Sequence, residues 1–230
     1  MTRETIRENV ERIRRELAEA SAGRYPVPRL MAVTKTRTPE EILLLKDVGI
    51  TEIGENRVQE LKSKLPSLGN AFQVHLIGRL QRNKVRQIIG DVCMIHSADS
   101  LELAEEISRR ALDAERRMNV LAEISPAGEA QKGGISPKET EAFLRRIAPL
   151  EGIRVKGLMA VMPLTEDTEY LDHLFAGMRK LYEQIRETAI DGIDMEELSM
   201  GMSGDYQLAA KHGATVVRIG SAIFGPRELH

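Results

Sequence analysis

Eight short apolar runs recur along the chain, and a helical pattern lies between each run and the next. The runs that we expect to form strands are 30–34, 52–54, 72–77, 92–96, 119–124, 154–161, 197–200 and 215–219. The helical patterns cover 39–48, 56–65, 82–89, 100–117, 137–147, 167–189 and 204–212. Seven helical crossovers that join eight strands predict a parallel sheet closed into a single (βα)8 TIM barrel, with its helices outside.

An open, doubly wound α/β sheet would show the same alternation. We favour the barrel because no G-x-G-x-x-G turn follows the first run and eight regularly spaced units suit closure. Residues 1–22 have apolar positions at spacings of three and four, which predicts an extra N-terminal helix packed on the barrel. "GPRELH" follows the eighth run, so the last helix should be short or absent. We expect residues 1–230 to form one domain.

Composition excludes several classes of function. The net charge of -2 gives no overall positive field that would recruit nucleic acid or an acidic membrane. Cys93 is the single cysteine, which excludes an internal disulfide and a multi-cysteine metal site. No apolar run approaches the roughly 20 residues of a membrane span, and the charged N-terminus is unlike a secretory signal. We therefore expect a cytoplasmic protein that binds neither nucleic acid, membrane nor metal.

A lysine stands at the inner end of the first apolar run, in "AVTKT" (32–36). Met31, Val33 and Lys35 fall on one face of the strand, so Lys35 reaches the barrel mouth if Val33 lies in the core. In this fold the chemistry gathers at the carboxyl ends of the strands. One interpretation of Lys35 is a salt bridge to a nearby carboxylate. The other is a Schiff-base lysine, because partial burial favours the free amine that attacks an aldehyde.

Small residues follow the seventh and eighth runs. Ser203 and Gly204 come from "GMSGD" (201–205), and Gly220 and Ser221 come from "RIGSAIFG" (218–225). Hydroxyls and backbone N–H groups at a helix start can cradle a phosphate, and this fold often binds phosphate in these two loops. Gly-Ser pairs are also common in ordinary turns. A phosphorylated aldehyde would satisfy both this cradle and the lysine.

Two more polar residues are expected near the barrel axis or mouth. Arg218 shares a strand face with Val216 and Gly220, so its buried guanidinium requires a ligand acceptor or a carboxylate such as Glu123. Asn56 follows the second run, where a place at the mouth and a helix N-cap fit equally well.

Six motifs together carry a family resemblance: "AVTKT" (32–36), "GENRVQE" (54–60), "HLIGRLQRNK" (75–84), "GLMAV" (157–161), "GMSGD" (201–205) and "VRIGSAIFG" (217–225). In this order they resemble the pyridoxal phosphate homeostasis proteins, also called the proline synthetase co-transcribed family. The resemblance implies a barrel like the N-terminal domain of alanine racemase that carries pyridoxal 5'-phosphate (PLP) on a lysine.

The resemblance also implies a role for each matching residue. Lys35 becomes the Schiff-base lysine, and Arg218 is placed against the pyridine nitrogen of PLP. The implied cofactor-binding residues are Lys35, Asn56, Met159, Ser203, Gly204, Arg218, Gly220 and Ser221, four of them at the phosphate (Ser203, Gly204, Gly220 and Ser221). We interpret His75 as a packed strand residue, not a catalytic base, and assign no role to the glycine-rich segment 125–136.

Three functions compete for this chain. The first is a monomeric PLP-binding protein that keeps the cofactor in homeostasis and passes it to PLP-dependent apoenzymes. The second is an amino-acid racemase with weak activity, and the third is a cofactor-free Schiff-base aldolase. A racemase of this type takes a second acid/base from another domain, whereas this chain ends at His230, directly after the barrel. An aldolase would leave Arg218 without a role. We favour the first function and expect no catalytic residue.

Overall fold

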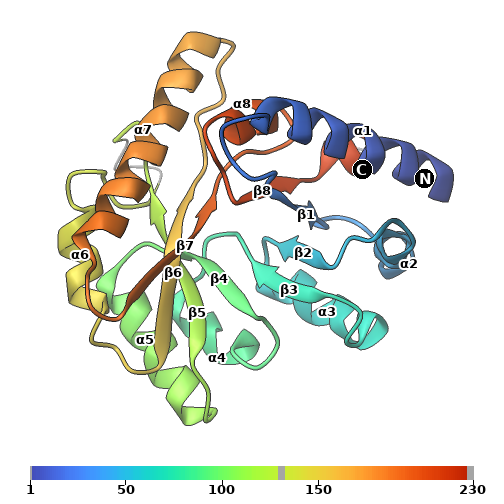
Figure 1. The fold of residues 1–230 in the computed structure, drawn as a ribbon. Coiled ribbons are helices and arrows are strands. Elements are labelled where there is room, and N and C mark those ends of the chain that lie inside the picture. The colour runs from blue at the N-terminus through green and yellow to red at the C-terminus, as the bar shows by residue number, and fades with distance from the viewer. Residues whose placement is uncertain (1, 129–132, 227–230) are drawn as a thin grey trace.

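The computed structural model describes residues 2–128 and 133–226, and within them a closed parallel barrel (Figure 1). Its strands are β1 (Arg29–Val33), β2 (Glu52–Glu55), β3 (Gln73–Leu76), β4 (Met94–Ala98), β5 (Met118–Ile124), β6 (Ile153–Ala160), β7 (Ile193–Ser199) and β8 (Val216–Ile219). Each strand pairs with the next, and β8 pairs with β1, where Met31 lies opposite Arg218. The predicted (βα)8 barrel is confirmed.

The crossovers between the strands form the outer layer. They contain α2 (Pro39–Leu43), η1 (Leu44–Val48), α3 (Val58–Leu68), η2 (Arg82–Lys84), α4 (Val85–Ile88), α5 (Leu101–Asp113), α6 (Thr140–Ile147), α7 (Thr168–Thr188) and α8 (Tyr206–Lys211). The four-residue helix α9 (Ser221–Phe224) follows β8, as expected for a short last helix. Strand β7 begins at Ile193, before the predicted start at 197. Asp194 and Glu196 alternate with apolar residues there, so this part of the strand does not stand out in the sequence as an apolar run.

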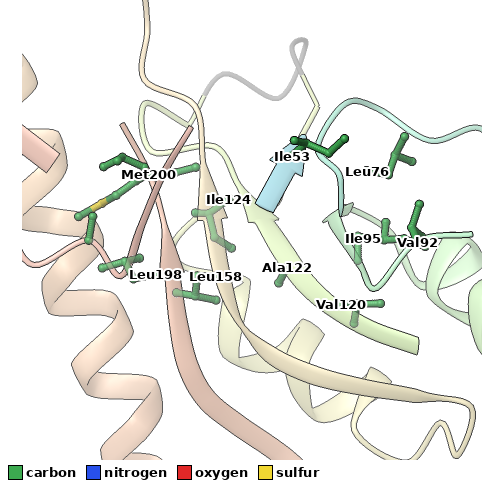
Figure 2. Packing of buried hydrophobic residues seen from close by; sticks show 14 of the residues in the cluster. Ile53, Leu76, Val92, Ile95, Val120, Ala122, Ile124, Leu158, Leu198 and Met200 are labelled. Atoms are coloured by element: carbon green, nitrogen blue, oxygen red, sulfur yellow. The ribbon is translucent and has the colours of Figure 1, made fainter. Parts of the chain in front are cut away.

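The hydrophobic core has two parts. The larger part fills the space between strands and helices, where alternate strand residues such as Ile53, Leu76, Val120 and Leu198 point outward (Figure 2). The smaller part lies inside the barrel. Its buried apolar side chains are Met31, Val33, Leu121, Met159 and Val216, which do not belong to the outer cluster. This inner part forms the floor under the barrel mouth.

The N-terminal helix α1 (Arg3–Ser21) lies across the last elements of the chain, as Figure 1 shows. Thr2 caps it by accepting a hydrogen bond from the Thr5 N–H. Ile6 and Val10 belong to a buried stripe that packs against η1, α8 and α9. The predicted extra helix is therefore confirmed.

Two negative findings apply to the described part of the chain. Its helices are all too short or too polar to cross a membrane. Nowhere in it do three or more His, Cys, Asp or Glu side chains gather in a way that could hold a metal ion. Lys132, within the glycine-rich segment, lies outside the described residues.

Candidate functional site

Lys35 lies in the turn directly after β1, at the carboxyl-terminal mouth of the barrel. Met31 and Val33 are buried, and Lys35 is half-buried. Thr34 turns the other way, toward Glu55 on the outside of the sheet, where its hydroxyl donates to Oε1 at 2.6 Å. The alternation along β1 therefore brings Lys35 to the mouth above the inner core.

The loops after β7 and β8 meet beside this mouth. Ser203 Oγ accepts hydrogen bonds from the backbone N–H groups of Gly220 at 3.1 Å and Ala222 at 3.2 Å. Ser221 is exposed at the start of α9, and a Cβ added to Gly204 would meet nothing within 4 Å. The four small residues thus come from two loops that touch, with backbone donors already gathered around one oxygen atom.

Arg218 lies inside the barrel, with 3% of its surface exposed. Its Nη1 donates to Ser199 Oγ and its Nη2 to the Ala160 carbonyl, both at 2.7 Å. The alternative of an ion pair with a carboxylate such as Glu123 is not found, because no carboxylate among the described residues lies within 4.0 Å of the guanidinium. Burial lowers the pKa of Arg218 to about 10, opposed by the charges of Asp205 and Glu123. A guanidinium has five N–H groups, so donors remain for another acceptor.

A chain of buried polar groups extends from Arg218 through the barrel interior. Ser199 Oγ lies 3.2 Å from His96 Nδ1, and His96 Nε2 lies 3.0 Å from His75 Nδ1. His75 Nε2 is buried and has no hydrogen-bond partner among the described residues. Burial lowers the pKa of His75 to about 4 and that of His96 well below its ordinary value. His75 is thus a packed neutral side chain, and its hydrogen-bond partner within the described residues is His96 and not a carboxylate.

The hydroxyl of Ser199 joins Arg218 to the two histidines. Because Arg218 can only donate, Ser199 Oγ accepts from it, and the same oxygen shares a hydrogen bond with His96 Nδ1. His96 Nε2 and His75 Nδ1 share the next hydrogen bond, so one of these two nitrogens carries its proton. His96 and Ser199 were not singled out in the sequence, although strand parity with Met94 and Glu197 places them on the inner face.

Glu123 is a largely buried acidic residue of β5. It lies on β5 opposite Met159 of β6, and it lines a cavity of about 360 Å³ between the loops after β5 and β6. Burial raises the pKa of Glu123 to about 7, with repulsion from Asp99 acting in the same direction and Arg218 and Arg79 opposing it. Met159 is fully buried beside it.

Asn56 lies between β2 and α3, at the edge of a cavity of about 960 Å³ that also borders Arg57 and Arg79. Arg57 occupies the N-cap position of α3, so the N-cap interpretation of Asn56 is wrong. The Asn56 Oδ1 atom is buried and has no partner among the described residues. A buried acceptor in this state is costly unless a ligand or water satisfies it.

The chain is similar to known proteins in both sequence and fold. Residues 2–228 match the family model described as "Alanine racemase, N-terminal domain". The pyridoxal phosphate homeostasis protein of Aquifex aeolicus is 36% identical over 220 residues, which cover 95% of either chain. A crystal structure of an unknown protein from Bifidobacterium adolescentis is 37% identical, with a TM-score of 0.91 over 96% of this chain and 95% of that one.

A further solved relative carries a ligand. The structure of PipY from Synechococcus elongatus PCC7942 with PLP bound is 32% identical to this chain. Its TM-score is 0.85, over 96% of this chain and 100% of PipY.

Proposed function

The chain belongs to the pyridoxal phosphate homeostasis protein family, and from that premise we propose that it binds PLP as a Schiff base on Lys35 and passes the cofactor on to PLP-dependent apoenzymes. One observation carries the proposal: Lys35, Arg218 and the paired loops after β7 and β8 all belong to one end of one barrel. An aldehyde, a ring nitrogen and a phosphate on one small molecule need those three groups together.

The residues present fit such a cofactor. The backbone donors now bonded to Ser203 Oγ, with the Ser221 hydroxyl, suit a phosphate. Spare N–H groups of Arg218 suit the pyridine nitrogen, and the Asn56 Oδ1 atom lacks the donor that a bound ligand could provide. Met159 provides apolar surface on the inner wall, and Gly204 leaves the loop surface open.

Arg218 favours a carrier over an enzyme. When bound, PLP supplies an aldehyde and an electron-withdrawing ring, and that ring withdraws electrons strongly when its nitrogen is protonated. Arginine only donates and stays charged even with its pKa at about 10, so it keeps the ring nitrogen as an acceptor. The ring then stabilises negative charge on an attached amino acid weakly. The site is better suited to holding the cofactor than to turning over substrate.

The Schiff base is tested by chemical trapping. Protein loaded with PLP is reduced with borohydride, digested with trypsin and mapped by mass spectrometry. Modified Lys35 resists trypsin, so the label should appear on the peptide from residue 30 to residue 37, between Arg29 and Arg37. A Lys35→Ala variant should lose the visible absorption. Label found mainly on Lys132 or Lys211 would refute the assignment.

Delivery needs a separate assay, because a protein can bind PLP without handing it over. A purified apo-aminotransferase is mixed with the loaded protein in the presence of a scavenger that destroys free PLP. We expect reactivation faster than the rate at which the loaded protein releases PLP into buffer. Reactivation that the scavenger abolishes would refute delivery while leaving binding intact. Racemisation of alanine at ordinary enzymatic rates would refute the carrier role itself.

A further inference from the structure

A buried group of charged side chains lies under the turn that carries Lys35. Lys64 of α3 is 8% exposed in its side chain, and Glu55 of β2 is 2% exposed. Lys64 Nζ donates to Glu55 Oε1 at 2.8 Å and to Glu60 Oε1 at 2.7 Å. Glu55 Oε1 also accepts from the Thr34 hydroxyl, while its Oε2 atom is buried and has no partner among the described residues.

The same group holds the main chain on both sides of Lys35. Before Lys35, Lys64 Nζ donates to the Thr34 carbonyl at 2.8 Å. After Lys35, the Thr36 N–H donates to Glu60 Oε1. Because Lys64 and Glu60 are also bonded to each other, one ion pair on α3 fixes the two peptide groups that flank the lysine.

The backbone at this point needs such support. Thr36 has a φ of 65°, in the left-handed region that β-branched residues rarely adopt. A strained residue of this kind persists when its surroundings over-determine it, and strain of this kind clusters at functional sites. The Glu60 bond to the Thr36 N–H is one such support, and the Arg37 N–H, which donates to the Thr34 carbonyl at 3.1 Å, is another. Loss of the Glu60 bond leaves the Thr36 N–H without its acceptor, so we expect the turn to loosen and the direction of the Lys35 side chain to change.

Stability alone is a poor explanation for this arrangement. Removing charged groups from water is expensive, and apolar side chains of the same volume often stabilise a fold as well or better. Burial raises the pKa of Glu55 although Lys64 and Thr34 act to lower it. The raised pKa reflects the free-energy cost of keeping this carboxylate charged away from water. A charged donor and a charged acceptor, however, can hold a backbone carbonyl and a backbone N–H in place through hydrogen bonds. Apolar side chains cannot form such bonds.

We propose that Lys64 and Glu60 are positioning residues that clamp the Thr34–Thr36 turn and so orient the Lys35 amine toward the barrel mouth. Glu55 holds the Lys64 ammonium in place from below. The clamp rests on the proposed role of Lys35 as the PLP-binding lysine. According to this proposal, side chains of α3, outside the barrel, control the reactivity of the Lys35 amine by controlling its orientation.

The test measures how fast Lys35 reacts in wild-type protein, Lys64→Met and Glu60→Ala. The rate of PLP attachment is followed by absorbance, and the reductive methylation of Lys35 by formaldehyde is followed by mass spectrometry. We expect both rates at Lys35 to fall about tenfold or more, because small misplacements of a reacting group are costly. The Thr36 amide should exchange its proton faster in Glu60→Ala, whereas Glu60→Gln, which keeps an acceptor oxygen, should restore much of the wild-type behaviour.

Lys62→Met is the matched control. Lys62 lies on the same helix and pairs with Asp91 at 2.9 Å, but on the exposed surface away from the turn. This variant should react as wild type does. If Lys64→Met does not fold, Glu60→Ala carries the test, because Glu60 is only half-buried. Wild-type reaction rates in Glu60→Ala, despite faster Thr36 exchange, would overturn the clamp.

Failure of the proposed function would look different. Wild-type protein would then take up methyl groups at Lys35 but no PLP. The methylation rates of the variants would still test the clamp, since formaldehyde needs no cofactor site.

Discussion

Replacing Glu123 by glutamine should make the stability of the protein less dependent on pH. The pKa of Glu123 is raised from 4.5 to about 7 in the folded state, mainly because the carboxyl is buried. The folded protein therefore holds this proton more tightly than the unfolded chain does. That contribution to stability is fully present below about pH 4.5 and is lost as the pH rises through about 7. At about 1.4 kcal/mol for each unit of pKa, the loss amounts to about 3 kcal/mol.

Urea unfolding of the PLP-free protein at pH 5 and pH 8 measures this difference. Glu123→Gln stays neutral throughout, so it should gain about 2–3 kcal/mol relative to wild type between the two pH values. Comparing variant with wild type cancels the titration of the buried histidines. Glu19→Gln, at an exposed position on α1, should show no such gain. A constant difference between Glu123→Gln and wild type at both pH values would refute the reasoning.

Three further outcomes follow from the structure. Changing Ser203 and Ser221 together to alanine should weaken PLP binding about tenfold or more in equilibrium dialysis, and unchanged affinity would place the phosphate elsewhere. The His75 pKa of about 4 means that this ring favours folding above about pH 6.5 and that the benefit is lost as the pH falls through 4. His75→Gln should therefore flatten the acid side of the stability profile, and an unchanged acid slope would contradict it. Gly157→Ala should prevent folding, since its Cβ would lie 1.9 Å from a carbonyl oxygen at a φ of 142°; circular dichroism would show this, and Gly177→Ala, with open space around it, should fold normally.

The barrel was predictable from the sequence because apolar runs and helical patterns alternate regularly along the chain. Each strand is an apolar run bounded by a helical pattern, and a misplaced boundary, as at Ile193, does not change the count of units. Lys35 follows β1 and Ser203 lies in the loop after β7, and the fold itself brings such strand ends together, whereas the roles of these residues stay predictions.

Contacts that depend on side chains from distant elements were not predictable in this way. On its helical pattern, Lys64 looks like any solvated lysine, and its burial arises because α3 packs over the end of β2. The chain from Ser199 to His75 depends on how three strands are aligned inside a closed barrel. Arg218 bonds to a hydroxyl and a carbonyl, not to a carboxylate. This choice of partners depends on local geometry, which the residue types alone do not predict.

The position of α1 has a consequence for the order in which the molecule can assemble during synthesis. The helix leaves the ribosome before the barrel does, yet its Asn9 side chain donates to the Ile223 carbonyl, 214 positions later. Until β8 and α9 have emerged, the stripe that includes Ile6 and Val10 lacks much of the surface that covers it in the finished protein. Contacts this far apart in sequence slow folding, because a long loop must close before they form. Docking of α1 therefore belongs to the last stage of assembly. A nascent chain stalled before β8 would expose the apolar stripe of α1 to chaperones and to other unfinished chains.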